Sequence, residues 1–169
     1  MQRSNKGFTL MEVLLVMAVL SLIALSGLSN IVFDHYSALK QRESLKADAT
    51  SLVDLIDRAR SHSVNTGRPI YMCGGLECNG NWSERIFLAD ERSLSSIYVS
   101  ASLSPSAVVV WRGFPVLRDY IAFLPTGLSA YQNGSFYLCE DGNQALRVVI
   151  SQSGRAYLDS EQYEASECL

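Results

Sequence analysis

The feature that most constrains this chain is an almost unbroken apolar run near its start, from Phe8 to Leu28. A helix of about twenty apolar residues reaches across the ~30 Å hydrocarbon core of a bilayer. Arg3 and Lys6 precede the run and no acidic residue does, so the positive-inside rule places the N-terminus in the cytoplasm. The sequence therefore predicts a single-pass membrane protein whose C-terminal part lies outside the cytoplasm.

The acidic residue Glu12 is unusual inside such a run. An unpaired carboxylate in a membrane helix costs several kcal/mol, so Glu12 is a candidate for a functional role. The alternative is that its side chain reaches the nearby cytoplasmic interface. Small residues between Leu22 and Asn30 also leave an ordinary cleaved secretory signal open, although the run continues directly into more helix.

The helix is predicted to continue well beyond the apolar run, to about Ser63, because no proline or strong turn signal interrupts it. In residues 29–63 the pattern becomes amphipathic, with apolar residues recurring at spacings of three and four. The members of this stripe are Leu45, Ala49, Leu52, Leu55, Ile56 and Ala59. We expect the stripe to pack against a sheet, and Gly67 and Pro69 to end the helix.

Residues 64–169 are predicted to form a β-rich domain, because short apolar segments alternate with Gly, Asn, Pro and Ser clusters. One long helix followed by many strands indicates the α+β class. The predicted strands are residues 69–73, 85–89, 97–99, 107–112, 120–123, 135–139, 146–151 and 156–158.

Four cysteines follow the apolar run: Cys73, Cys78, Cys139 and Cys168. In an oxidising compartment an even number favours disulfides, and short separation favours Cys73 with Cys78 and Cys139 with Cys168. All three ways of pairing them stay open at this point. Zinc is disfavoured because just one pair is close in sequence and both histidines are distant from it.

Neither catalysis nor cofactor binding has support in the sequence. His62 lies beside two serines, but a serine and a histidine make no nucleophilic site without an orienting group and an oxyanion pocket. No phosphate-binding loop, metal-binding string or paired-acid signature is present. A formal net charge of -3 gives no general attraction to nucleic acid. We expect a structural protein without metal or cofactor.

The string Lys6-Gly7-Phe8-Thr9-Leu10-Met11-Glu12-Val13 resembles the class III signal of type IV pilins and type II secretion pseudopilins. The resemblance implies that residues 1–7 are a leader. A prepilin peptidase would cut between Gly7 and Phe8 and methylate Phe8. It also implies that Glu12 pairs with the N-terminal amine of a neighbouring subunit in the filament, which would set the axial register.

The second half resembles the C-terminal domain of the GspH and FimT/FimU minor pilins. The matching segments are Ala59-Arg60-Ser61, residues 66–70, 123–127, 136–139 and 148–151, and Gly154-Arg155. The resemblance implies a type IV pilin-like fold, with one long helix packed on a C-terminal β-sheet or sandwich. It further implies a bacterial inner-membrane protein with a periplasmic domain, which later joins major and other minor pilins at a filament tip and helps to initiate assembly.

Two other functions remain open from the sequence. A minor pseudopilin of a type II secretion system would share the signal, the helix and the domain. Some FimT-like relatives bind DNA through a Gly-Arg-x-Arg motif, but here Gly154-Arg155 is followed by Ala156 and Tyr157. Arg147 could approach Arg155 across neighbouring strands and form a weak site. We favour a turn glycine and a solvated arginine, because the acidic residues downstream would repel phosphates.

Overall fold

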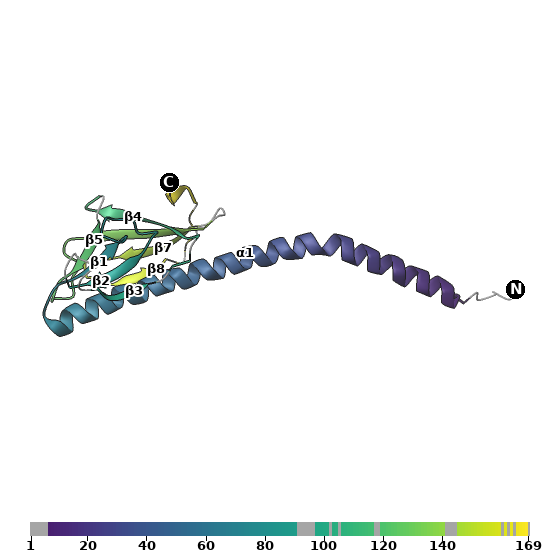
Figure 1. The fold of residues 1–169 in the computed structure, drawn as a ribbon, viewed down its shortest axis with the longest axis horizontal. Coiled ribbons are helices and arrows are strands. Elements are labelled where there is room, and N and C mark those ends of the chain that lie inside the picture. Colours follow the sequence, from purple (N-terminus) through teal and green to yellow (C-terminus); the bar gives the residue numbers. More distant parts are fainter. Residues whose placement is uncertain are drawn as a thin grey trace. The chain divides into compact units, whose positions relative to one another are not determined.

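The computed structural model describes residues 7–90, 97–101, 103–104, 106–116, 119–140, 145–159, 161, 163 and 165–168, with the backbone alone at 24–35, 38 and 165. The chain divides into two compact units, Met1–Lys40 and Gln41–Leu169. The first unit holds the beginning of the long helix α1 (Leu10–Thr66). The second holds the remainder of α1 and the strands that the structure describes (Figure 1).

Helix α1 has a clear reason to end where it does. Gly67 has a φ of 65°, a left-handed conformation in which glycine commonly terminates a helix. The hydroxyl of Thr66 donates to the carbonyl of His62, 2.8 Å away, within the last turn. The helix thus reaches Thr66 rather than Ser63, because its terminator is the glycine itself and no earlier residue breaks the hydrogen-bond ladder.

In the part of the chain that the structure describes, eight strands form two four-stranded antiparallel sheets. They are β1 (Ile70–Gly74), β2 (Ile86–Ala89), β3 (Ile97–Ala101), β4 (Val108–Phe114), β5 (Tyr120–Phe123), β6 (Asn133–Cys139), β7 (Ala145–Ile150) and β8 (Ala156–Leu158), followed by the short 3₁₀ helix η2 (Ala165–Cys168). The strand orders are β3-β2-β1-β5 and β4-β6-β7-β8. The α+β fold class is confirmed, and a strand lies at or within two residues of every predicted segment.

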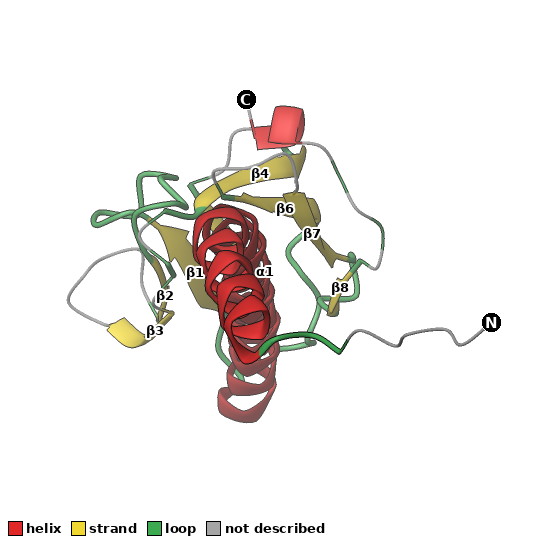
Figure 2. Cartoon of the chain, turned by 90° about the vertical axis from the view of Figure 1, so that its right-hand side faces the viewer, coloured by secondary structure: helices red, strands yellow, loops and turns green. Residues whose placement is uncertain are grey.

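The core lies between the two sheets and the outer part of α1, which Figure 2 shows seated between β1–β3 on one side and β6–β8 on the other. The predicted apolar stripe is confirmed. Ala49, Leu52, Ile56 and Ala59 are fully buried, and they join one hydrophobic cluster with residues from both sheets. Neither sheet could bury its inner face without this helix.

Polar contacts fasten the end of α1 to the sheet. The buried hydroxyl of Ser63 lies 2.9 Å from the carbonyl oxygens of both Arg68 and Phe123. One turn earlier, Nε of Arg60 donates to the carbonyl of Gly127 at 3.1 Å. These contacts fix the helix end against β5 and the loop that follows it.

Side chains cover two of the sheet edges. Gln132, which is 2% exposed, accepts from the backbone N–H of Ala122 at 2.6 Å and donates to the carbonyl of Tyr120 at 3.2 Å, so its amide continues the ladder beyond β5. The hydroxyl of Ser83 accepts from the N–H of Val109 on β4 at 2.8 Å. Within the described residues, the edge of β3 that faces away from β2 has no such cover.

Candidate functional site

The first turn of α1 is capped by Thr9. Its side-chain oxygen accepts from the backbone N–H of Glu12 at 3.3 Å, and its carbonyl accepts from Glu12 and Val13 at 3.0 and 3.2 Å. Threonine followed three residues later by glutamate is the spacing of a capping box, a signal present in the sequence that our interpretation missed. The Glu12 carboxylate therefore lies in the first helical turn, where the helix dipole favours negative charge.

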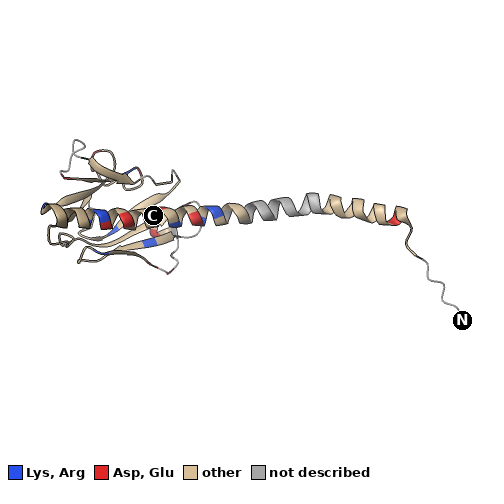
Figure 3. Ribbon diagram, turned by 90° about the horizontal axis from the view of Figure 1, so that it is seen from below, with Lys and Arg blue, Asp and Glu red and all other residues tan. Residues whose placement is uncertain are grey.

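The first turns of α1 present apolar side chains to their surroundings almost without exception. Figure 3 shows this segment free of basic residues, with one acidic position in its first turn. The exposed fraction is 81% for Phe8 and 78% for Leu10. The other exposed apolar residues here are Met11, Val13, Leu14, Leu15, Val16, Met17, Val19, Leu20, Leu22 and Ile23. A contiguous apolar surface of this kind is a binding surface for lipid or protein.

Among the described residues, no helical stretch combines the length and the apolar character needed to cross a bilayer. The side chains of residues 24–28, the end of the predicted membrane segment, lie outside the described part of the chain.

Of the three ways to pair the four cysteines, the structure has the one that short sequence separation favoured. Cys73 pairs with Cys78 across a Cα–Cα distance of 4.8 Å, and Cys139 pairs with Cys168 across 6.3 Å. The first closes a small loop that begins at Gly74. Trp82 packs against Gly74 so closely that a Cβ there would meet the indole ring at 2.7 Å, and the Trp82 side chain is only 4% exposed. Trp82 is therefore a core anchor of this loop.

The second disulfide fastens the C-terminal segment to the outer face of the sheet that contains β6. Three further kinds of contact hold the same segment. Arg112 forms an ion pair with Glu167 at 3.2 Å, and Tyr163 exchanges two backbone hydrogen bonds with Ala145. The rings of Tyr163 and Tyr137 also meet edge to face, with their centroids 5.7 Å apart. The segment thus lies against β4, β6 and β7.

Arg147 is at the centre of this arrangement. Its Nε donates to the Ser135 hydroxyl and its Nη1 to the Tyr163 hydroxyl, both at 2.9 Å, and Nη1 lies 3.6 Å from a carboxylate oxygen of Asp159. The hydrogen bond to Tyr163 is the main cause that raises the pKa of Arg147 above its ordinary value. An arginine side chain is charged in any case, and the described partners of Arg147 belong to this chain.

The structure does not bring Arg147 and Arg155 together, which was the less favoured alternative. The N–H of Asp159 donates to the carbonyl of Arg147, and the N–H of Ser151 donates to the carbonyl of Arg155, so the two arginines lie at opposite ends of the β7–β8 hairpin. Four residues of strand separate them, or about 13 Å at 3.3 Å per residue. Arg155 is an exposed side chain beside the turn of Gly154, and no paired basic site forms.

His62 shows no catalytic arrangement. Its ring packs on the ring of Tyr98, with centroids 4.3 Å apart, and its Nε2 lies 3.7 Å from Asp90. The neighbouring hydroxyl of Ser63 is committed to backbone carbonyls. No cluster of three or more metal-ligating side chains occurs in the part of the chain that the structure describes.

Solved structures with this fold come from two bacterial systems. The type IV minor pilin FimU of Pseudomonas aeruginosa is 19% identical, with a TM-score of 0.60 over 74% of this chain and 96% of that chain. A second crystal form of FimU gives 18% identity and a TM-score of 0.56 over 70% and 96%. The minor pseudopilin EpsH from the type 2 secretion system of Vibrio cholerae is 11% identical, with a TM-score of 0.51 over 69% and 96%. These likenesses show the fold.

No curated protein sequence matches this chain. Two family models do. The prokaryotic N-terminal methylation motif matches residues 2–28, which include Gly7, Phe8 and Glu12. The model described as type II transport protein GspH matches residues 48–154, more than half of the chain. The chain therefore belongs to the GspH family, and is a minor pilin or pseudopilin of the kind that serves type IV pili or type II secretion systems.

Proposed function

We propose that this chain is a minor pilin of a type IV pilus, which helps to initiate assembly at the filament tip. In this proposal residues 8–28 anchor the precursor in the inner membrane, with the N-terminus in the cytoplasm and the C-terminal domain in the periplasm. A prepilin peptidase then cuts between Gly7 and Phe8 and methylates Phe8. The same helix afterwards packs among major and other minor pilins.

The observation that carries the proposal is the exposed apolar segment that directly follows the methylation signal. Such a surface must be covered, first by lipid and later by the helices of neighbouring subunits. Glu12 fits the second environment, because its carboxylate can pair there with the positive N-terminal amine of a neighbour. An unpaired charge in that low dielectric would be penalised, so the pair would fix the axial register.

The test is the intact mass and N-terminal sequence of the full-length protein extracted from membranes, for the natural chain and for Gly7→Val. A Cβ at position 7 meets no atom within 4 Å, so the substitution acts on recognition by the peptidase and leaves packing unchanged. We expect methylated Phe8 as the first residue of the natural protein and an unprocessed Gly7→Val chain. Ser21→Val, within the same apolar segment, is the control and should be processed normally.

A chain that begins after Ala24 or a later small residue would overturn the proposal, because it would mean secretion through an ordinary signal. If the chain is cut between Gly7 and Phe8, the remaining question is whether it serves a type IV pilus or a type II secretion system. A strain in which the gene is deleted answers this question. Loss of surface pili with intact protein secretion supports the minor pilin. Loss of secretion with intact pili would assign the chain to a type II secretion system as a minor pseudopilin.

A further inference from the structure

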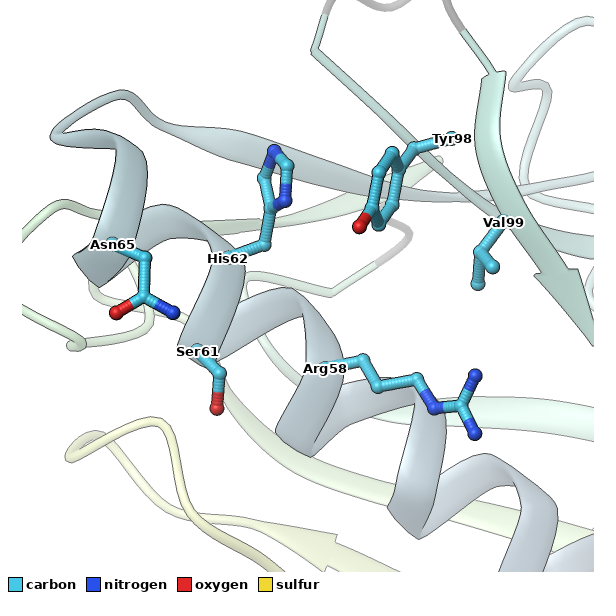
Figure 4. Close-up of a pocket in the computed structure, with 6 residues that line it drawn as sticks. All are labelled: Arg58, Ser61, His62, Asn65, Tyr98 and Val99. Carbon is cyan, nitrogen blue, oxygen red and sulfur yellow. The ribbon is translucent and has the colours of Figure 1, made fainter.

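An open groove of mixed polar and apolar lining lies between the outer part of α1 and the edge strand β3. Its volume is about 590 Å³, and its lining comes from four residues of the helix and two of the strand (Figure 4). These residues are Arg58, Ser61, His62, Asn65, Tyr98 and Val99. The groove belongs entirely to the C-terminal unit and has no part in the methylation signal.

A β-bulge builds one wall of the groove. Val99 is paired with Leu88, and Ile97 with Ala89, so Tyr98 is an extra residue in β3 without its own partner in β2. A bulge turns a side chain away from the direction that strand alternation would give it. Figure 4 shows the Tyr98 ring facing the ring of His62. Tyr98 is held in this position although 58% of it is exposed.

The other wall offers hydrogen-bond donors in a row. Arg58, Ser61 and Asn65 follow one another at helical spacing on one side of α1, and all three are exposed. His62 has Asp90 as a neighbour, whereas Arg58 forms no ion pair or hydrogen bond with any described residue. Arg58 to Asn65 spans about 10 Å of helix at 1.5 Å per residue, the length of about three residues of extended chain.

We infer that this groove docks a carboxylate-bearing segment of a neighbouring filament subunit, with Arg58 as the anchor and Tyr98 as the apolar platform beside it. The inference rests on the proposed function as a filament subunit. A guanidinium binds a carboxylate through two parallel hydrogen bonds, and Arg and Tyr are enriched among the residues that carry the binding energy of protein interfaces.

Two other classes of ligand fit the groove less well. A small molecule is normally enclosed over most of its surface, but the lining side chains here are mostly exposed. Nucleic acid presents a row of phosphates that several basic side chains must neutralise, whereas Arg58 is the one lysine or arginine among the six lining residues. A single guanidinium instead matches a single carboxylate on a protein.

The test is photo-crosslinking in living cells, with a photoreactive amino acid at Ser61 in the full-length chain. We expect a light-dependent product with another subunit that carries an N-terminal methylation signal, joined through a peptide that contains Asp or Glu. Arg58→Glu should lower the yield by about tenfold or more, because like charges would then face each other. Lys46→Glu is the matched control, since Lys46 is exposed on the same helix outside the groove, and it should leave the yield unchanged.

Several results would overturn the inference. They are an unchanged yield with Arg58→Glu, an equal loss with Lys46→Glu, a crosslinked peptide without an acidic residue, or a product with DNA. Thermal unfolding of each purified variant separates loss of docking from loss of folding, and Arg58→Lys should recover part of the yield. If the chain begins with methylated Phe8 and no subunit is crosslinked, the docking inference fails while the proposed function stands. If Phe8 is not the first residue, the proposed function itself fails.

Discussion

Replacing Gly154 with alanine should destabilise the fold far more than replacing Gly67, although both glycines have a positive φ, 73° and 65°. An L-residue in this left-handed conformation costs roughly 1–2 kcal/mol, and the restricted unfolded chain of alanine returns about 0.4–1 kcal/mol. At Gly67 a Cβ meets nothing within 4 Å, so the change in stability is the conformational cost minus the gain from the restricted unfolded chain. We expect Gly67→Ala to lower the free energy of unfolding by about 1 kcal/mol.

At Gly154 an alanine would pay the same conformational cost and would also clash with the surrounding backbone. A Cβ there would overlap the carbonyl oxygen of Gly127 and press on the N–H of Ser129, so two backbone segments would have to separate. We expect a total loss of about 3 kcal/mol or more, typical of forced backbone displacement. Urea unfolding of the intact chain in detergent, followed by the fluorescence of the buried Trp82 and Trp111, measures both variants. Equal losses would refute the close backbone approach at Gly154.

Three further results are expected. Leu52→Ala removes a fully buried side chain and should cost about 2–5 kcal/mol in urea unfolding, whereas the exposed Thr50→Ala should stay within about 0.5 kcal/mol. Replacing both cysteines of the Cys139–Cys168 pair by serine should cost about 3–4 kcal/mol, and the Cys73–Cys78 pair about 2 kcal/mol, because their sequence separations are 29 and 5; equal losses would contradict this reasoning. Glu12→Gln should be processed normally but enter sheared filaments more than about tenfold less, as measured by immunoblot; full incorporation would contradict the proposed pairing.

The elements of the fold could be predicted because each depends on local signals. The helix continues as long as nothing interrupts its hydrogen-bond ladder, and the stripe from Leu45 to Ala59 is visible in the spacing of apolar residues. The strands are short apolar segments between turn residues. The order β3-β2-β1-β5 could not be predicted, because it depends on which distant strands meet around the helix.

Register explains why the two arginines do not meet. Arg147 and Arg155 are close in sequence, and a hairpin between them was correctly expected, but the position of its turn decides which residues face each other. With the turn at residues 151–154, Arg155 faces Ser151 and Arg147 faces Asp159. The acidic residues after β8, read in the sequence as a reason for phosphate repulsion, include the partner of Arg147 itself.

The Thr9 cap and the Tyr98 bulge were both missed, but for different physical reasons. The cap depends on residues three apart, so the string Thr9-Leu10-Met11-Glu12 already contains all that it needs. The bulge depends on an offset between β2 and β3 that no neighbouring residue encodes. A residue that is oriented by such an offset can lie on the surface, and there the packing of the core does not determine which amino acid it is. Tyr98 is of this kind: its ring packs on the ring of His62 although 58% of the residue is exposed, so the docking contact proposed above would give this orientation a role.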